Sequence, residues 1–340
     1  MTRNLFLLSF TANGEKLANR IIEKLYGDSQ LIIHNKRIKK LENYIDSIFR
    51  KNHILVFIGA AGIAVRAVAP LLQNKMTDPA VIVIDEAGRY VIPLLSGHVG
   101  GANRFAEQIA ALIGAIPVLT TATDVNGVFS IDTFAVEKDY IIVNPKMIKE
   151  ISSQILQGHN VGLTSEFEIT GQTPDHVKIK NKGRVGIYIG TKFNYKPFTR
   201  TLHLIPKCFH IGIGTMRNIS FQKLNIFFQN ILKEQNISVE WIGSLASIDL
   251  KQNEKAILDL ANYYNIPFHT YSAEKLRQLE NQFSCSEFVR SVTGIGNVCE
   301  SSAYLASKCG EIVLGKTVNA GMTIAIAKES REICFDNCNK

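Results

Sequence analysis

The sequence has no long hydrophobic run, and no apolar stretch approaches the roughly 20 residues that a helix needs to cross a bilayer. Its first residues, MTRNLFLLSFTANG, lack the small-residue cleavage site of a signal peptide and are typical of a strand followed by a turn. The first 207 residues contain no cysteine, and the six cysteines that follow form no CxxC pair, so we expect reduced thiols. Together these absences predict a cytoplasmic protein with no membrane segment.

Motifs for binding metals and nucleic acids are also missing. The chain has no HExxH motif and no second histidine close to His98, which argues against a catalytic zinc held by the protein. A metal-binding site in the C-terminal tail, formed by Cys334 and Cys338 with Glu332 and Asp336, is an alternative, but we expect no protein-bound metal. No recognition-helix, RNP or zinc-finger pattern occurs, so we expect no nucleic-acid partner.

Length and composition predict several folded domains. A chain of 340 residues is long for one hydrophobic core, and 46% apolar with 20% charged residues is typical of a globular protein. The formal net charge is +8, distributed as +4 over residues 1–130, +3 over residues 131–206 and +1 over residues 207–340. This positive charge would attract a polyanion. Because the sequence has no nucleic-acid motif, an acidic small molecule is an alternative ligand.

Strand-like and helix-like segments alternate along the chain. Strands are expected at Leu5–Phe10, Ile54–Ile58, Val81–Ile84 and Val91–Leu95, and amphipathic helices follow several of them. Such alternation is typical of an α/β fold whose parallel sheet binds ligands at its carboxyl edge. We predict an N-terminal doubly wound parallel sheet in residues 1–130, a small β-rich middle region in residues 131–206, a second α/β domain in residues 207–330 and a tail in residues 331–340.

The first candidate site is a glycine turn, Gly59-Ala60-Ala61-Gly62, which joins a strand to a helix. Its glycines would let a ligand approach the backbone, and the helix N-terminus favours anions. The turn lacks the third glycine of a dinucleotide fingerprint and the GK[ST] of a phosphate loop, which disfavours a nucleotide. Arg66, one turn into the helix, is either a carboxylate ligand at the same edge or an ordinary surface arginine.

A sharper candidate is the segment VIVIDEAGRYVIPLLSGHVGGAN, residues 81–103. Imidazole has the pKa that suits proton transfer near neutral pH, and N–H groups at the following helix start could hold an oxyanion. Asp85 or Glu86 could orient His98; alternatively, the carboxylates cap a turn with Gly88 and the histidine bonds its own loop. The candidate residues in this segment are Asp85, Glu86, Ser96, Gly97, His98, Gly100, Gly101 and Asn103.

Three further turns carry hydroxyl groups or glycines. Thr120-Thr121-Ala122-Thr123-Asp124 places three hydroxyls and an acid after a predicted strand, either for a polar ligand or as a helix cap. In the C-terminal region, Gly212-Ile213-Gly214 and Gly294–Glu300 each lead towards a helix. Cys299 could be a nucleophile beside Glu300, but in a first helical turn a small core residue is the favoured interpretation.

The block from Gly59 to Asn103, the segment PVLTTATD at 117–124 and the segment GIGNVCESSA at 294–303 closely resemble the CbiG family of anaerobic cobalamin biosynthesis. The resemblance covers nearly the whole chain, in the family's order of N-terminal, middle and C-terminal parts. One loop departs from the family pattern, which continues its glycine turn with a cysteine and two basic residues. Here Gly214 is followed by Thr215-Met216-Arg217, and only Arg217 keeps the basic character.

The resemblance implies a cobalt-precorrin-5A hydrolase. Such an enzyme opens the ring-A δ-lactone of an anionic cobalt corrinoid and releases the C20 two-carbon fragment as acetaldehyde, giving cobalt-precorrin-5B. Cobalt arrives with the substrate, so we expect no cofactor bound by the protein. A homodimer and transient contact with neighbouring pathway methyltransferases are further expectations. A nonhydrolytic corrinoid carrier of the same pathway, a nucleotide-dependent enzyme and an interaction protein are the alternatives.

Together with the residue chemistry, the resemblance implies roles for individual residues. His98 is expected to be the general base, with Asp85 or Glu86 as its orienting partner, and N–H groups around Gly100-Gly101 are expected to stabilise the oxyanion. The residues expected to contact the substrate are Gly59, Gly62, Arg66, Ser96, Gly97, Gly100, Gly101, Asn103, Thr121, Thr123, Asp124, Gly214, Arg217, Gly296 and Glu300.

Overall fold

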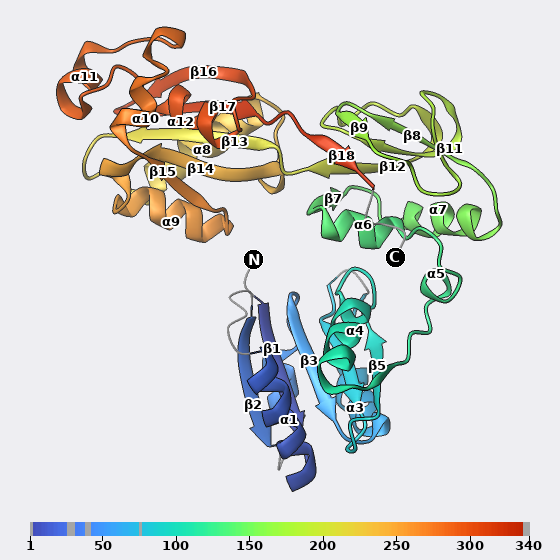
Figure 1. The fold of residues 1–340 in the computed structure, drawn as a ribbon. Helices are drawn as coiled ribbons and strands as arrows, with labels where there is room; N and C mark the ends of the chain where they lie inside the picture. Colours follow the sequence, from blue (N-terminus) through green and yellow to red (C-terminus); the bar gives the residue numbers. More distant parts are fainter. Residues whose placement is uncertain (1–2, 26–30, 38–41, 75–76, 336–340) are drawn as a thin grey trace. The chain divides into compact units, whose positions relative to one another are not determined.

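The computed structural model of the chain describes residues 3–25, 31–37, 42–74 and 77–335 (Figure 1). The chain divides into two compact units. Of the described residues, the first comprises those in the ranges 3–137 and 152–159, and the second comprises those in the ranges 138–151 and 160–335. Cys338, one of the two cysteines of the predicted tail, lies outside the described residues.

The first unit is built on a six-stranded sheet with the order β2-β1-β3-β4-β5-β6. The first four strands in this order are parallel, β5 is antiparallel to β4, and β6 is parallel to β5. The strands are β1 (Arg3–Ser9), β2 (Leu31–Arg37), β3 (His53–Ile58), β4 (Ala80–Ile84), β5 (Tyr90–Leu95) and β6 (Ile116–Pro117). The helices are α1 (Ala12–Leu25), α2 (Glu42–Ile48), α3 (Ala61–Val68), η1 (Ala69–Leu71), α4 (Ala102–Ile113), α5 (Ala122–Val125) and α6 (Ile131–Glu137).

Helices cover both faces of this sheet, because successive side chains of a strand point to opposite sides. Leu5 and Leu7 of β1 pack in one core with α1 and α4, whereas Phe6 and Leu8 pack in another core with α2 and α3. This is the doubly wound arrangement predicted from the sequence, and the α/β fold class is confirmed. The departure from an all-parallel sheet is the pair β5 and β6, which run in the opposite direction to the other four strands.

The second unit contains two five-stranded sheets. The first has the order β10-β8-β11-β12-β7 and is parallel except for β7. Its strands are β7 (Tyr140–Ile142), β8 (Val161–Ser165), β10 (Val177–Ile179), β11 (Gly183–Ile189) and β12 (Phe198–Pro206). Helix α7 (Lys146–Leu156) follows β7, and its residues 152–156 belong to the first unit. In the predicted tail, β18 (Glu332–Cys334) pairs with β9 (Glu168–Thr170), so this part of the tail is a strand beside the middle region.

The other sheet of the second unit has the order β15-β14-β13-β17-β16. Helices α8 and α9 pack on one face and α12 on the other. The strands are β13 (Phe209–Thr215), β14 (Ile242–Ile248), β15 (Phe268–Tyr271), β16 (Glu311–Asn319) and β17 (Met322–Lys328). The helices are α8 (Phe221–Glu234), η2 (Val239–Trp241), η3 (Asp249–Lys251), α9 (Lys255–Tyr264), α10 (Ala273–Arg277), η4 (Glu280–Gln282), α11 (Glu287–Thr293) and α12 (Cys299–Ala306).

Each of the three predicted regions thus contains one large sheet, while the boundaries between independent domains stay a prediction. Among the described residues, no helix has both the length and the hydrophobicity required to span a membrane.

Candidate active site around His98

The antiparallel pairing of β4 with β5 places the predicted N-terminal site residues at opposite edges of the first sheet. The last residue of β4, Ile84, pairs with Val91 near the start of β5. Leu95, the last residue of β5, pairs with Val81 near the start of β4. At about 3.3 Å per residue, the carboxyl ends of these two strands lie roughly 10–13 Å apart along the strand direction.

Asp85 lies at the carboxyl edge of the parallel strands and stabilises its own turn. Its carboxylate accepts hydrogen bonds from three backbone N–H groups, those of Ala87, Arg89 and Tyr90, at 3.2, 2.8 and 2.6 Å. The turn-capping alternative is therefore confirmed for Asp85. Its predicted role as the orienting partner of His98 is wrong, because the two residues follow the ends of antiparallel neighbours.

Glu86 and the glycine turn share the edge of Asp85. The Glu86 carboxylate accepts a hydrogen bond from the Thr11 hydroxyl at 2.5 Å, so its predicted role as a partner of His98 is wrong for the same reason. The Gly59 N–H donates to the carbonyl oxygen of Ile84 at 2.8 Å, which ties the glycine turn to this edge. The other two residues predicted as ligands here, Gly62 and Arg66, are exposed in α3.

His98 lies at the other edge, in a tight loop between β5 and α4. The loop is closed by hydrogen bonds from the Gly101 N–H to the His98 carbonyl oxygen at 3.0 Å and from the Ala102 N–H to the Ser96 carbonyl oxygen at 3.2 Å. A Cβ atom on Gly100 would lie 2.3 Å from that of Ser96, and Gly101 has a φ of 81°, so the backbone requires both glycines. The N–H of Gly101, which was expected to face an oxyanion, is donated within the loop.

The carboxylate beside the imidazole belongs to Asp132, in the first turn of α6. Nδ1 of His98 lies 3.1 Å from Oδ1 and 3.2 Å from Oδ2 of Asp132, and the two side chains are only 11% and 8% exposed. The Ser130 hydroxyl donates to Oδ1 of Asp132 at 2.7 Å. An ionised carboxylate can only accept hydrogen bonds, so Nδ1 carries a proton and Nε2 is the basic nitrogen of the neutral ring.

The hydrogen bonds around Asp132 keep it ionised. Burial by itself would raise the pKa of Asp132, but hydrogen bonds from His98 and Ser130 and the charge of a protonated His98 lower the pKa below its usual value. A buried, ionised carboxylate can hold an imidazole in one orientation and stabilise the imidazolium that forms when Nε2 takes a proton. Asp132 therefore has the geometry that the sequence interpretation assigned to Asp85 or Glu86.

Threonines from the segment after β6 complete the surroundings of the imidazole. Oγ1 of Thr123 lies 3.2 Å from Nε2 of His98, and Thr123 is buried. The buried Asn103 donates from Nδ2 to Oγ1 of Thr121 at 3.1 Å. The structure thus brings three of the predicted residues to the His98 loop. The backbone of Asp124 continues α5, but its side chain lies outside the described residues.

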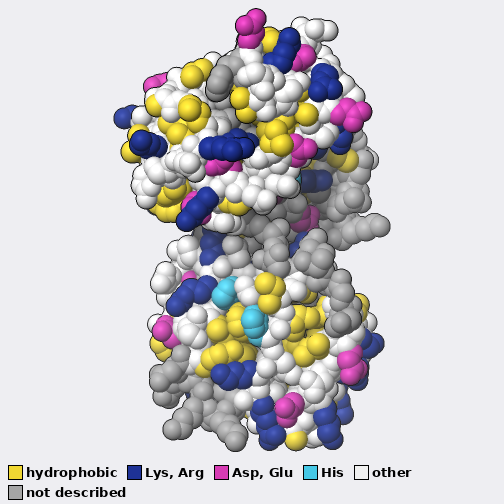
Figure 2. Space-filling model, turned by 90° about the vertical axis from the view of Figure 1, so that its left-hand side faces the viewer, with side chains coloured by type: hydrophobic (Ala, Val, Ile, Leu, Met, Phe, Trp, Pro, Cys, Tyr) yellow, Lys and Arg dark blue, Asp and Glu magenta, His cyan; other side chains and the backbone are white. Residues whose placement is uncertain are grey.

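Two arginines that the sequence did not indicate lie beside the loop. The Arg3 guanidinium donates to the carbonyl oxygen of Gly100 at 2.7 Å, and the guanidinium carbons of Arg3 and Arg104 lie 5.1 and 5.3 Å from the centre of the Phe105 ring. Burial and the charge of Arg104 lower the pKa of Arg3. On the face of the molecule shown in Figure 2, Lys and Arg side chains are interspersed with acidic and apolar side chains.

The predicted contacts from the C-terminal region lie in the second unit. Glu300 is buried, and its carboxylate accepts hydrogen bonds from the Asn297 side chain, from the Ser284 hydroxyl at 2.8 Å and from the Lys316 N–H at 3.1 Å. Burial raises the pKa of the Cys299 thiol to about 11, which supports its interpretation as a core residue. Contact with the substrate stays a prediction for Gly214, Arg217, Gly296 and Glu300.

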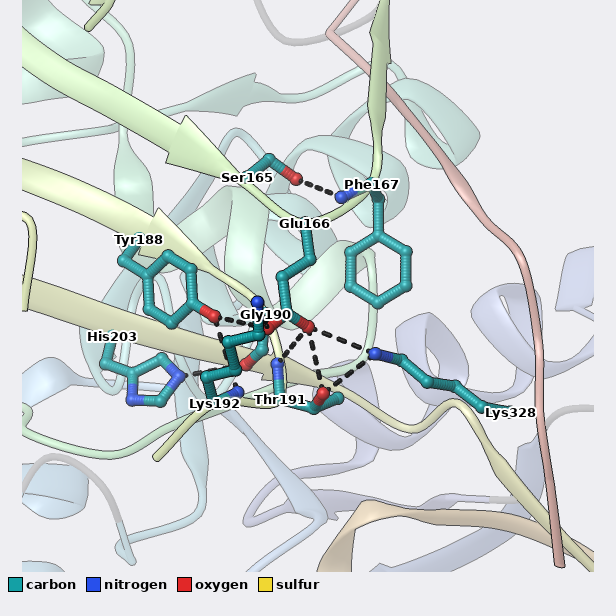
Figure 3. Close-up of polar contacts among 9 residues, drawn as sticks. All are labelled: Ser165, Glu166, Phe167, Tyr188, Gly190, Thr191, Lys192, His203 and Lys328. Carbon is teal, nitrogen blue, oxygen red and sulfur yellow. Dashed lines mark hydrogen bonds and ion pairs between the residues drawn. The ribbon is translucent and has the colours of Figure 1, made fainter. Parts of the chain in front are cut away.

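A polar cluster in the second unit was missed by the sequence analysis (Figure 3). Glu166, after β8, accepts hydrogen bonds from the Tyr188 hydroxyl at 2.7 Å and from the N–H and hydroxyl of Thr191 at 2.8 and 2.9 Å. Lys328, at the end of β17, donates to the same carboxylate at 3.1 Å. Burial alone would raise the pKa of Glu166, but these bonds lower it to about 2. The cluster ties the middle sheet to the C-terminal sheet.

The ionised state of Glu166 predicts a loss of stability in acid. Its pKa is about 2 in the folded protein and 4.5 in a free side chain, so its contribution is complete above pH 4.5 and lost as the pH falls towards 2. Glu166→Gln should be less stable than wild type at pH 7, with the difference narrowing below pH 4.5. Thermal unfolding between pH 7 and pH 3 measures this, with Glu168→Gln, an exposed neighbour, as control. A difference that is constant over this range would contradict the assignment.

No group of three or more His, Cys, Asp and Glu side chains suited to a metal ion occurs within the part of the chain that the structure describes. Cys334 lies in β18, where it pairs with Thr170 of β9.

Comparisons with known proteins place both units in one family. A family model described as cobalamin synthesis G N-terminal matches residues 43–124, and one described as cobalamin synthesis G C-terminus matches residues 209–327. A crystal structure of a cobalamin biosynthesis protein G homolog from Sulfolobus solfataricus aligns with 96% of this chain and 97% of its own, at 23% identity and a TM-score of 0.43.

Three curated relatives are named for the same activity, one of them as probable. The cobalt-precorrin-5A hydrolase of Salmonella typhimurium is 36% identical over 285 residues, which cover 80% of this chain and 81% of the relative. That of Priestia megaterium is 28% identical and covers 83% and 80%. The probable cobalt-precorrin-5A hydrolase of Methanocaldococcus jannaschii is 28% identical and covers 95% and 98%. Because the two family models together match more than half of the chain and the Salmonella relative aligns over four fifths of it, the chain belongs to the CbiG family.

Proposed function

We propose that the protein is a cobalt-precorrin-5A hydrolase of cobalamin biosynthesis. The observation that carries this function is the 36% identity to the Salmonella enzyme over four fifths of both chains. The matches to the relatives of Priestia megaterium and Methanocaldococcus jannaschii extend over a similar or larger share. The protein is therefore an enzyme whose substrate is a small corrinoid, and the reaction is hydrolysis.

The chemistry assigned to this function is opening of the ring-A δ-lactone, followed by release of the C20 fragment as acetaldehyde. Opening a lactone requires a base that takes a proton from the attacking group and a donor for the tetrahedral oxyanion. We assign the base to Nε2 of His98 and its orientation to Asp132. Cobalt is part of the substrate, and we propose that the protein supplies no cofactor of its own.

A direct test supplies purified protein with cobalt-precorrin-5A and measures acetaldehyde after derivatisation, together with the mass of the corrinoid product. Stoichiometric acetaldehyde and cobalt-precorrin-5B are expected. Saturable binding of the corrinoid without acetaldehyde would instead fit a nonhydrolytic carrier. Nucleotide binding at the Gly59–Gly62 turn without corrinoid turnover would fit a nucleotide-dependent enzyme, and a thermal-shift series with NAD and ATP measures it.

We propose that the acidic side chains of the substrate approach the edge of the first sheet where His98 lies. The exposed Arg104 supplies a positive charge there, whereas the exposed Arg66 lies in α3, a helix that begins at the opposite edge. Arg104→Ala should raise KM about two- to fivefold with little change in kcat, since an exposed ion pair contributes at most about 1 kcal/mol. The effect should shrink at high ionic strength.

Arg66→Ala is the matched variant for this measurement, because it removes the same charge from a helix that begins at the other edge. A higher KM for Arg66→Ala and an unchanged KM for Arg104→Ala would place the substrate at the carboxyl edge instead, as the sequence analysis predicted. Steady-state kinetics of both variants at two salt concentrations decides between the edges.

A cytoplasmic location, a homodimer and transient contact with neighbouring methyltransferases also belong to this proposal. Cell fractionation, light scattering and crosslinking of the purified enzymes, respectively, would test these three statements.

A further inference from the structure

The two ring nitrogens of His98 have different partners, and the difference identifies the group whose proton the base can take. Nδ1 faces the Asp132 carboxylate and lies 3.3 Å from the Ser130 hydroxyl. Nε2 faces the hydroxyl of Thr123 at 3.2 Å. A general base must lie within hydrogen-bond reach of the proton that it removes. The Thr123 hydroxyl meets this condition.

The position of Thr123 favours its hydroxyl as the partner of the base. Thr123 is 5% exposed, whereas the preceding Ala122 is exposed and Thr121 is partly exposed. The 3.2 Å between Oγ1 of Thr123 and Nε2 of His98 is short enough for direct proton transfer. Hydroxyl, imidazole and carboxylate thus form a chain of nucleophile, base and orienting group, an arrangement recognised by geometry and not by residue order.

We infer that Thr123 is the nucleophile that opens the lactone and that the reaction passes through an ester on its side chain. This inference rests on the proposed function. In the first step, the Thr123 hydroxyl gives its proton to Nε2 of His98 while Oγ1 bonds to the lactone carbonyl carbon. The ring C–O bond then breaks, and the leaving oxygen takes the proton from the imidazolium.

In the second step, water restores the enzyme. The water gives a proton to Nε2 and its oxygen bonds to the ester carbonyl carbon. The bond to Oγ1 breaks, and Oγ1 takes back the proton from the imidazolium. The sum of the two steps is lactone plus water giving a hydroxy acid, with no oxidation or reduction.

Substitution of Thr123 separates a nucleophile from a hydroxyl that only positions the imidazole. Thr123→Val keeps the shape of the side chain and removes the hydroxyl, and it should lower kcat at least about 100-fold. Thr123→Ser should retain measurable turnover. Thr11→Val, which removes an exposed hydroxyl at the opposite edge, is the control. Melting temperatures show whether each variant is folded.

Covalent labelling distinguishes a nucleophile from a residue that only positions the imidazole, because only a nucleophile forms an ester with the substrate. Acid-quenched wild-type protein with cobalt-precorrin-5A should carry an ester on the peptide that contains Thr123, detected by mass spectrometry, and Thr123→Val should not. 4-Nitrophenyl acetate, an activated ester that needs no corrinoid site, should acetylate the same hydroxyl.

The outcomes for this inference and for the proposed function are distinct. If folded Thr123→Val releases acetaldehyde at the wild-type rate, Thr123 is not the nucleophile, although the hydrolase function stands. If 4-nitrophenyl acetate labels Thr123 but the wild-type protein does not convert cobalt-precorrin-5A, Thr123 is a nucleophile and the proposed substrate is wrong.

Discussion

Substitution of His98 by asparagine should lower kcat/KM for acetaldehyde release by about 100-fold or more, because it removes the proposed base. The asparagine amide can still donate a hydrogen bond towards Asp132, so the buried carboxylate keeps a partner and the fold should survive. What disappears is Nε2, the nitrogen that lies 3.2 Å from the Thr123 hydroxyl. The measurement is a time course of acetaldehyde at saturating and at low substrate.

The control for this prediction is His34→Asn. His34 belongs to the same unit but is exposed, and its Nε2 lies 2.9 Å from the side-chain oxygen of Asn4. That variant should retain wild-type kinetics. If His98→Asn were folded and as active as wild type, the base would have to be another residue, and the site proposed around His98 would be excluded.

Substitution of Asp132 by asparagine should lower kcat by roughly two orders of magnitude, again because the base loses its function. An amide can present either its oxygen or its NH2 group to Nδ1 of His98. When it presents the NH2 group, Nδ1 must be the acceptor, so Nε2 carries the proton and can no longer take one. The neutral amide also cannot stabilise the imidazolium that forms during the reaction.

Asp85→Asn provides the matched comparison, since it makes the same chemical change at the carboxylate that was predicted to orient His98. Asp85 accepts hydrogen bonds from three N–H groups of its turn, a role that an amide oxygen can largely retain. We expect wild-type kcat and a small decrease in melting temperature. A loss of kcat in Asp85→Asn with none in Asp132→Asn would restore the first assignment and contradict the structure.

The contrast between these two acids shows how far sequence patterns can locate a site. The histidine loop could be recognised because glycines flank His98 closely in the sequence and follow a strand of apolar residues. Asp132 could not be assigned in this way, because it lies 34 residues away from His98 and enters the site only through the start of α6. Contacts between residues so far apart in the sequence depend on where the chain comes back to the site in three dimensions. Local sequence patterns do not specify this.

One signal in the sequence could have corrected the placement of Asp85. Only five residues, 85–89, separate β4 from β5. A parallel connection requires a crossover of a dozen or more residues, whereas a short link joins antiparallel strands. The length of this link therefore indicates a hairpin, which puts Asp85 and His98 at opposite edges of the sheet.

The sequence by itself determined the α/β class, the apolar strands, the glycine loop around His98 and the family, because these depend on local periodicity and on contiguous motifs. Only the tertiary structure decided which acid orients the imidazole, which hydroxyl faces Nε2 and that Glu166 meets Lys328. Those pairings join segments that are distant in the chain, and their geometry is set by strand direction and by helix packing on the sheets. The type of a residue alone carries no information on strand direction or on helix packing.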